Sequence, residues 1–480
     1  MTRLNQLGNG GSLKAEHGTG RVMAPYVRRQ YGDELYVVMT ELKRLCDPGQ
    51  LLNPGVLLSD DPEVHLKHIK LAPQVEVEVD RCVECGYCEP VCPSRDLTLT
   101  PRQRIVARRA IRSAELAGDA GLVERLEESY EYAGVETCAV DGMCQTACPV
   151  LINTGDLVRR LRRDDHSRLE AYGWRQAAKH WDVVSRGGAL GLSAAGRVPG
   201  ALVPAVRLAN EAARGVVGAE RLPLWSSELP RGGPARRRDA PSGTPDAVYL
   251  PACVNSMFGP ADGSSGVQAS FEDLCARAGL TLLVPEGVES LCCGTPWSSK
   301  GLPGGFAAMA ERVLPALLAA TRDGALPLVT DASSCTEGFV KMLATTTDTP
   351  VQVVDAMTFV VERVLPHLDD HPKLASITVH PTCSSTQLGI NASLTTLAAE
   401  VAEQVHVPVD WGCCAFAGDR GLLHPELTAA ATGPEAREVQ ALPSTAYASC
   451  NRTCEVGMTR ATGQTYRHVL EHLADVVRSS

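Results

Sequence analysis

The residues best suited to chemistry in this sequence are cysteines, gathered in two dense runs. The first run extends from Cys82 to Pro93 with the spacing C-x2-C-x2-C-x3-C-P, and the second extends from Cys138 to Pro149. Thiolates at the first spacing hold iron–sulfur clusters of the bacterial type, in which three wrap one cluster and the fourth, before a proline, reaches its neighbour. The spacing therefore predicts two clusters and a role in electron transfer.

On this rule each run contributes ligands to both clusters. Cluster one is predicted at Cys82, Cys85, Cys88 and Cys148, and cluster two at Cys92, Cys138 and Cys144. Asp141 stands where the register calls for a cysteine, and a carboxylate is a harder, weaker ligand for iron than a thiolate. Cluster two is thus either a three-iron cluster or a four-iron cluster with one labile, oxygen-ligated iron. A structural zinc site needs four ligands in two pairs, which two proline-ended runs fit badly.

The whole-chain composition limits the class of protein. At 480 residues the chain is long enough for two or three domains, and a net charge of −10 argues against a nucleic-acid partner. The 18 cysteines fall in metal-type spacings within a large chain, which does not indicate a disulfide scaffold. We see neither a signal peptide nor an uninterrupted apolar stretch of bilayer length. We therefore expect the protein in a reducing cytoplasm, alone or in peripheral contact with the inner face of the plasma membrane.

Basic helical segments lie between and after the two runs. Helices are predicted over 101–118 and 122–130, and we expect the arginines there to lie on a solvated face, with steering of an acidic partner as the alternative. These arginines are Arg102, Arg104, Arg108, Arg109 and Arg112, and the same expectation covers Arg159, Arg160, Arg162 and Arg163. Further helices are predicted over 156–214. Residues 223–245 are rich in Pro, Gly, Ser and Arg, a composition typical of an exposed linker.

A repeat of cysteine motifs fills the rest of the chain. The first copy carries Cys253, the pair Cys292-Cys293 and Cys335, while the second carries Cys383, the pair Cys413-Cys414, Cys450 and Cys454. Strands are predicted at 247–250, 327–330, 377–379 and 407–409, with helices at 306–321 and 356–365. Cysteines at the carboxyl ends of strands in an α/β domain would converge on one face. Asp331 aligns with Cys450, so the fuller second set is the better candidate for a cluster, while the first set is either degraded or uses the Asp331 carboxylate.

The remaining features are two cysteines outside any motif and the first 60 residues. Cys46 and Cys275 lie outside any motif, and we expect both in the core, where free cysteine behaves as a small hydrophobe. A glycine-rich turn contains Glu16-His17, a helix is predicted from Asp33 to Leu45, and Asn53 precedes Pro54-Gly55.

These motifs resemble known families. The pairing of Ala-Glu-His-Gly-x-Gly with Leu-x-Pro-Gly is similar to the C-terminal end of FAD-linked oxidases that act on D-2-hydroxy acids. That resemblance implies that Glu16 binds a catalytic divalent metal, that His17 takes the hydroxyl proton, and that Asn53 lies at the cofactor. The cysteine repeat resembles the "CCG" domain of heterodisulfide reductases and glycolate oxidase iron–sulfur subunits, although its second copy has Cys-Cys-Ala. Such domains hold iron–sulfur clusters or act at disulfides, so the resemblance implies that the cysteines of both copies are metal ligands or thiols that react with disulfides.

The order of parts predicts an α+β multidomain protein. We expect an FAD-linked oxidase remnant (1–60), a helical two-cluster ferredoxin-type domain (74–165), a helical segment and linker (166–245), and a duplicated α/β cysteine-rich domain (246–365 and 366–480). This order resembles the C-terminal half of bacterial D-lactate dehydrogenases of the FAD and iron–sulfur type. The implied chain of electron carriers runs from a D-2-hydroxy acid through FAD and 4Fe-4S clusters to a cytochrome or quinone.

The FAD-binding domain of that family is not found in these residues, so we expect a partner flavoprotein half to supply it. A split gene and a truncated reading frame are both open. Two other functions also stay open: a stand-alone electron-transfer subunit for glycolate or glycerol 3-phosphate oxidation, and a thiol/disulfide enzyme similar to heterodisulfide reductase.

Overall fold

A computed structural model describes residues 12, 20–67, 69, 72–236 and 243–479. The chain divides into two compact units, residues 1–73 and 74–480. Glu16 and His17 lie outside the described residues.

One kinked helix dominates the described part of residues 1–73, α2 (Ala24–Cys46), followed by a short turn, η1 (Val64–Leu66). It begins before the predicted Asp33, and Gly32 at φ +81° breaks its backbone. Asp47 ends the helix, because its carboxylate accepts hydrogen bonds from the Leu51 and Leu52 amides at 2.9 and 3.0 Å.

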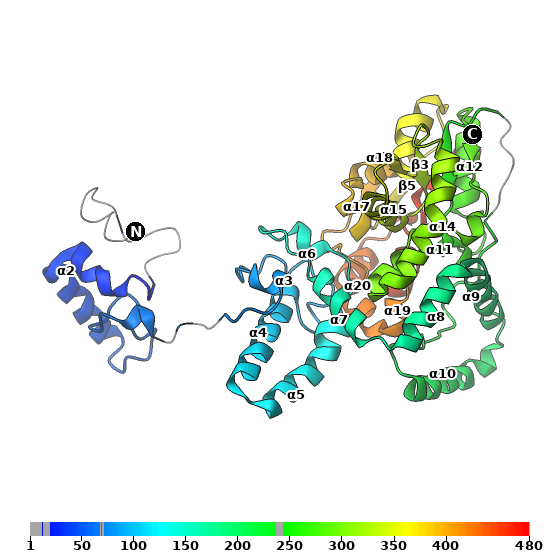
Figure 1. Ribbon diagram of the computed structural model, residues 1–480. Helices are drawn as coiled ribbons and strands as arrows, with labels where there is room; N and C mark the ends of the chain where they lie inside the picture. Colours follow the sequence, from blue (N-terminus) through cyan, green and yellow to red (C-terminus); the bar gives the residue numbers. More distant parts are fainter. Residues whose placement is uncertain (1–11, 13–19, 68, 70–71, 237–242, 480) are drawn as a thin grey trace. The chain divides into compact units, whose positions relative to one another are not determined.

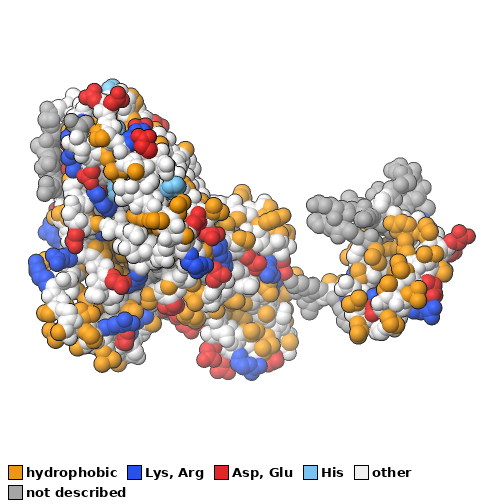
Figure 2. Space-filling model, turned by 180° about the vertical axis from the view of Figure 1, so that it is seen from behind, with side chains coloured by type: hydrophobic (Ala, Val, Ile, Leu, Met, Phe, Trp, Pro, Cys, Tyr) orange, Lys and Arg blue, Asp and Glu red, His pale blue; other side chains and the backbone are white. Residues whose placement is uncertain are grey.

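Apolar side chains of α2 remain exposed. Val38, Leu42 and Leu45 are 61%, 61% and 74% exposed, and Figure 2 shows hydrophobic side chains over much of the visible face of this unit. The prediction that Cys46 is a core residue is wrong: its side chain is exposed, because this side of α2 is left uncovered in the part of the chain that the structure describes. Cys275, by contrast, is buried as expected.

The second unit begins with helices that carry the cysteine runs. The elements are α3 (Val77–Asp80), α4 (Pro101–Ala117), α5 (Ala120–Tyr130), η2 (Glu131–Glu136), α6 (Met143–Thr146) and α7 (Thr154–Asp165). Thr100 begins α4 with a capping box to Gln103, and Gly118 ends it in the left-handed conformation. α4 and α5 thus form the predicted helical pair between the cysteine runs (Figure 1).

A helical segment follows, as predicted, and covers one side of the repeat. It comprises α8 (Arg168–Lys179), α9 (Trp181–Ala195), η3 (Gly200–Leu202) and α10 (Val203–Val217). α8 packs on α14 (Pro303–Thr321) and α9 on α11 (Cys253–Met257), as Figure 1 shows. No single helix among the described residues is long and apolar enough to cross a membrane; α9 and the η3–α10 segment meet that test only as a pair, with a bend of 102° between them.

The cysteine repeat builds two parallel sheets of the same topology. The first has the order β2-β1-β3-β4 and the second the order β6-β5-β7-β8. Their strands are β1 (Ala247–Leu250), β2 (Leu282–Leu283), β3 (Leu328–Thr330), β4 (Val353–Asp355), β5 (Leu374–Val379), β6 (Ala402–His406), β7 (Ala446–Ser449) and β8 (Tyr466–His468). The predicted strand at 407–409 is wrong, because β6 ends at His406 and Pro408 follows, a residue that cannot donate to a ladder.

Helices connect the strands of both sheets. The other elements of the first copy are α12 (Val267–Arg277), η4 (Val288–Ser290), α13 (Thr295–Lys300), α15 (Ser333–Thr346), α16 (Ala356–Phe359), η5 (Val360–Val364) and η6 (Leu365–His367). Those of the second are α17 (Cys383–Gln387), α18 (Asn391–Val401), α19 (Arg420–Leu423), α20 (Pro425–Ala441), α21 (Arg452–Thr462) and α22 (Val469–Arg478). The mixed helical and parallel-sheet architecture confirms the predicted fold class.

The two copies share one hydrophobic core. Buried residues of both sheets belong to a single cluster, and α22 of the second copy packs on α12 of the first. The strands β1 and β7 are buried along their whole length, as expected for parallel sheets covered on both faces. This core fixes the carboxyl ends of the strands, where the cysteines lie.

Candidate metal centres

The four cysteines predicted for cluster one line a single cavity. Cys82, Cys85, Cys88 and Cys148 surround it together with Pro101 and Ile105 of α4. Burial raises the pKa of Cys88 to about 11, so this thiol is protonated at neutral pH unless a metal displaces the proton. The structure thus groups these residues as the spacing predicts; that they bind iron stays a prediction.

A second cavity contains the residues predicted for cluster two. Cys92, Cys138, Cys144 and Asp141 line it, and Pro101 and Thr154 border both cavities. The two cavities are therefore neighbours on either side of the α4 and α7 N-termini. Such closeness suits electron exchange between two bound clusters.

Asp141 supplies the test of whether a metal group fits this second cavity. The residue is half-buried, but its Oδ2 atom is buried and has no hydrogen-bond partner in the structure. Burial raises the pKa of Asp141 to about 6, and burial together with the Asp141 charge raises that of Cys144 to about 12. A buried, unpaired carboxylate oxygen beside three thiols is unfavourable alone and is a natural ligand set for a cation. The residues fit an iron–sulfur cluster.

Buried arginines hold the loops around both cavities, so the prediction of a solvated arginine face is wrong for three of them. Arg104 is 1% exposed; its guanidinium donates to the Gly134 carbonyl at 2.8 Å, to the Ser94 hydroxyl at 2.9 Å and to Cys92 Sγ at 3.6 Å. Hydrogen bonds to backbone carbonyls and thiols satisfy the buried cation. Sequence reasoning assigned basic residues to solvent because these partners are remote in sequence.

Arg109 and Arg162 act in the same way. Arg109 donates to the Val79 and Cys82 carbonyls at 2.7 and 3.0 Å and pairs with Glu84, fixing the first cysteine loop. Arg162 donates to the Cys138 carbonyl at 2.8 Å and to the Ser299 carbonyl at 3.0 Å. It thereby joins the second cysteine run to the first copy of the repeat. Arg112, in contrast, lies exposed on α4 and pairs with Glu115.

The second cavity also contacts the second copy of the repeat. The Asp141 carboxyl group lies beside the Cys413 thiol, and the Gln387 amide of α17 donates to the Asp141 carbonyl. Met143 packs in the same apolar cluster as Cys413 and Ala415. The second cysteine run and the second copy of the repeat therefore pack against each other at Asp141 and Met143.

In the first copy, the thiols converge near the carboxyl ends of β1 and β3, the two central strands of the sheet. Cys253 follows β1, Cys292 and Cys293 follow β2, and Cys335 lies in the first turn of the helix after β3. Cys253 and Cys292 Sγ atoms are 3.7 Å apart, and Cys293 contacts both Cys292 and Cys335. Asp331 points elsewhere: its carboxylate accepts hydrogen bonds from the Ala252 amide at 2.7 Å and the Tyr249 hydroxyl at 2.8 Å.

The second copy gathers four of its five thiols. Cys383 contacts Cys413, and the Cys414 and Cys454 Sγ atoms are 3.1 Å apart. The hydrogen bond between these two lowers the pKa of Cys414 to about 5, and the neighbouring His380 acts in the same direction. Cys450 is set apart among hydroxyls, with its Sγ 3.6 Å from Thr382 Oγ1 and 3.7 Å from Ser333 Oγ.

An imidazole that sequence reasoning missed stands beside the second set of thiols. His380 follows β5 directly, is fully buried, and its Nδ1 lies 2.8 Å from Glu435 Oε1. Burial disfavours a charged imidazole, but Glu435 and Cys414 outweigh it and raise the pKa of His380 to about 10. The available signal was its place at a strand end, three residues before Cys383.

The residue after each Cys-Cys pair has a left-handed backbone. Gly294 has φ +80°, and a Cβ there would lie 2.7 Å from the Phe306 ring. Its counterpart Ala415 has φ 56° and is wholly buried. The Cys-Cys-Ala variant noted in the sequence therefore keeps the same chain turn at the cost of backbone strain.

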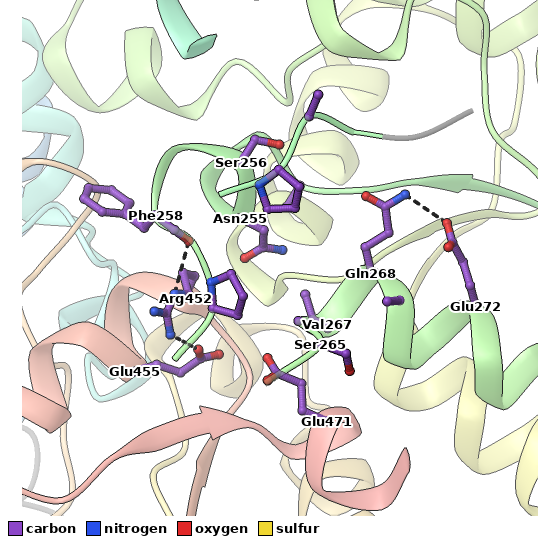
Figure 3. Close-up of a pocket in the computed structure, with 16 residues that line it drawn as sticks. Asn255, Ser256, Phe258, Ser265, Val267, Gln268, Glu272, Arg452, Glu455 and Glu471 are labelled. Carbon is purple, nitrogen blue, oxygen red and sulfur yellow. Dashed lines mark hydrogen bonds and ion pairs between the residues drawn. The ribbon is translucent and has the colours of Figure 1, made fainter. Parts of the chain in front are cut away.

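A groove without thiols lies between the two copies. Figure 3 shows Asn255, Ser256 and Gln268 of the first copy facing Arg452, Glu455 and Glu471 of the second. The Arg452 guanidinium spans the copies, since it donates to the Phe258 carbonyl and pairs with Glu455 at 2.7 Å. No sequence motif pointed to this groove.

Among the residues predicted from the flavin-oxidase resemblance, only Asn53 is described. It is exposed, has φ 44°, and its carbonyl accepts a hydrogen bond from the Val56 amide at 3.2 Å. The roles of Glu16, His17 and Asn53 stay predictions.

Comparisons with known families agree with the first two parts of the chain. Residues 3–57 match the family described as FAD linked oxidases, C-terminal domain, and residues 78–152 match the 4Fe-4S dicluster domain. A search of curated proteins finds no match. Neither family match reaches the cysteine repeat after residue 245, so its resemblance to CCG domains stays a prediction.

Proposed function

We propose that this iron–sulfur oxidoreductase, which carries a C-terminal segment of FAD-linked oxidases and a 4Fe-4S dicluster domain, is the electron-transfer half of an FAD-dependent D-2-hydroxy acid dehydrogenase, with D-lactate as the substrate. The observation that carries the proposal is the pair of neighbouring cavities in residues 78–152, each lined by the cysteines that spacing assigns to one cluster. Bound clusters would supply one-electron oxidation and reduction.

The residues around the cavities have complementary tasks. The thiols of Cys82, Cys85, Cys88 and Cys148 would hold the first cluster, and Cys92, Cys138, Cys144 and Asp141 the second. Arg109 fixes the backbone of the first cysteine loop. Arg104 donates to Cys92 Sγ, and a buried cation that hydrogen-bonds a ligand sulfur favours the reduced, more negative state of a cluster.

The contact between Asp141 and Cys413 supports an exit toward the repeat. It brings the second cavity against a group of buried thiols on the second copy. A cytochrome or quinone is the proposed acceptor beyond them, because a two-electron donor and one-electron carriers suit such acceptors better than NAD.

The exposed face of α2 supports a flavoprotein partner. Val38, Leu42 and Leu45 lie uncovered on a segment that belongs by family match to a flavin enzyme. Apolar side chains exposed in such a group mark a protein–protein contact. In this proposal the FAD-binding half covers that face and donates electrons.

Reduction of the full chain by flavin tests the proposal. Anaerobic protein is mixed with photoreduced FMN as donor, and the visible absorbance of the clusters is followed; a soluble quinone or cytochrome c is then added. We expect bleaching by reduced flavin, recovery with the acceptor, and no change with D-lactate alone. Bleaching by D-lactate alone, or recovery only with a disulfide acceptor, would contradict the proposal, and the second result would favour the thiol/disulfide enzyme.

A further inference from the structure

The two copies of the repeat differ at one position that faces their thiols. Strand registers place Val379 opposite Ala448 in the second sheet and Leu250 opposite Thr330 in the first. Since Asp331 and Cys450 each follow the strand directly, Thr330 corresponds to Ser449, and His380 therefore corresponds to Leu250. The second copy has an imidazole where the first has an apolar side chain.

His380 is oriented by a carboxylate on one side. Its Nδ1 lies 2.8 and 2.9 Å from the two oxygens of Glu435, which is itself 1% exposed. A carboxylate accepts hydrogen bonds, so Nδ1 carries a proton. Glu435 thus fixes both the tautomer and the plane of the ring.

The other ring nitrogen faces the thiols without a partner. Nε2 is buried and forms no hydrogen bond in the structure, and the whole His380 side chain is 0% exposed. One ring nitrogen of His380 and the Sγ atoms of Cys414 and Cys454 all lie within 4.8 Å of one another, and Nδ1 is engaged by Glu435. A carboxylate on one imidazole nitrogen and thiols beside the other is the arrangement of metal-binding histidines, in which a bound metal displaces the proton of the second nitrogen as it does those of the thiols.

From these observations we propose that the second cysteine group is a mixed thiolate–imidazole iron centre in which His380 Nε2 is a ligand beside Cys414 and Cys454. Cys413 and Cys383 lie next to this set, while Cys450 is held by hydroxyls and is not a ligand. The ligand assignment depends only on these contacts; its role as a late carrier rests on the proposed electron-transfer function.

The imidazole gives this centre a distinct property. Where histidine replaces cysteine on the iron of a cluster, the reduction potential rises, because a neutral ligand replaces a thiolate. The first copy, with Leu250 at the equivalent position, has no such ligand. The second centre is therefore the more oxidising of the two and the better final electron acceptor within the chain.

Isotope-edited pulsed EPR of the full chain tests the ligand. Protein labelled with 15N-histidine is prepared anaerobically, and spectra are recorded at stages of a reductive titration beside unlabelled protein. Residues 74–165 contain no histidine, so a strong histidine coupling cannot arise from the two predicted ferredoxin clusters. We expect a nitrogen coupling that changes with the label.

Variants distinguish ligation from folding defects. His380→Ala should remove the coupling, and His380→Cys should remove it while keeping the iron content and lowering the midpoint potential of that centre. His472→Gln is the matched control, because His472 is also buried but its Nε2 contacts the Tyr447 carbonyl at 3.0 Å; it should keep the coupling. Identical spectra from labelled and unlabelled wild-type protein with a full iron content would overturn the ligand assignment and leave the proposed function standing. Zinc at this site in place of iron would also overturn it, and absence of iron throughout the chain would overturn both.

Discussion

The carboxyl group of Asp141 lies beside the thiol of Cys413, a residue far along the chain in the second copy of the repeat. Asp141 also lines the cavity of Cys92, Cys138 and Cys144, and its Oδ2 has no partner there. One side chain therefore belongs to the predicted cluster-two site and to the boundary with the repeat. We therefore expect its chemistry to decide how firmly a second cluster is held.

Replacing Asp141 with cysteine should stabilise a four-iron cluster. A thiolate binds iron more tightly than a carboxylate, so the iron at this corner is retained better. After mild oxidation with ferricyanide, we expect the wild-type protein to give the EPR signal of a three-iron cluster and Asp141→Cys to give much less of it.

The control for this variant is Asp96→Cys, which adds a thiol at a side chain that is 59% exposed and should behave as wild type. Equal three-iron signals from Asp141→Cys and wild type would show that residue 141 is not at a cluster.

Loss of the buried Arg104 guanidinium should lower the midpoint potential of cluster two. Arg104→Met keeps most of the side-chain volume but removes the positive charge and the hydrogen bond to Cys92 Sγ. Both changes disfavour the reduced cluster. A potentiometric titration followed by EPR measures the shift, with Arg112→Gln on the exposed side of the same helix as the control.

Equal potentials in Arg104→Met and Arg112→Gln would contradict this role for Arg104. The Arg104→Met chain is also expected to be less stable, because the Gly134 and Thr137 carbonyls lose their donor. Comparing iron content in both variants separates lost cluster from shifted potential.

Gly294 and Gly263 provide a matched pair for the chain turn after the first Cys-Cys pair. Their φ angles are +80° and +81°, but a Cβ would meet the Phe306 ring and the Met342 methyl at Gly294 and nothing within 4 Å at Gly263. Gly263→Ala should cost about 1 kcal/mol of unfolding free energy through backbone strain alone. Gly294→Ala should cost roughly 2–4 kcal/mol because overpacking is added. Similar falls in Tm for the two variants would be inconsistent with this packing.

Buried His468 should make stability depend on pH. Burial lowers the pKa of His468 to about 3 from an ordinary value of 6.5, and His472 acts in the same direction. As pH falls, His468 becomes protonated in the unfolded chain but stays neutral in the folded chain. The stability contributed by neutral His468 is therefore fully present above pH 6.5 and is lost as pH falls toward 3.

His468→Asn isolates this effect, because asparagine can still accept the hydrogen bond from the Leu470 amide at the start of α22. Between pH 6.5 and 5, wild type should lose about 2 kcal/mol relative to the variant. Denaturant unfolding across this range measures the difference; a gap between the two proteins that does not change with pH would refute the prediction.

The sequence was most informative where chemistry imposes local spacing. Three closely spaced cysteines must wrap one metal group, so Cys82, Cys85 and Cys88 could be assigned to one cavity and the distant Cys148 added by the proline-ended pattern. The order of strands and cysteines in the repeat could be predicted for the same reason. Strand boundaries were less certain, as the region 407–409 after β6 shows.

Features set by distant partners could not be predicted. Arg104 can be buried because its guanidinium donates hydrogen bonds to the Gly134 carbonyl and the Cys92 thiol. The residues around Arg104 in α4 do not indicate either contact. The periodicity of α4 did offer a signal, since Arg109 lies four residues after buried Ile105. His380 could be identified as a candidate metal ligand only from its contact with Glu435 and from the strand register. Cys46 was predicted in the core because helical pattern alone does not show which side of α2 is covered.

Iron, acid-labile sulfide and flavin per chain, measured on anaerobically purified protein, test the central claim most directly. The two ferredoxin-type sites alone predict about seven or eight iron atoms with matching sulfide and no bound flavin. A third centre at His380 and the second thiol group would raise that number. Zinc in place of iron and sulfide would contradict the electron-transfer account altogether.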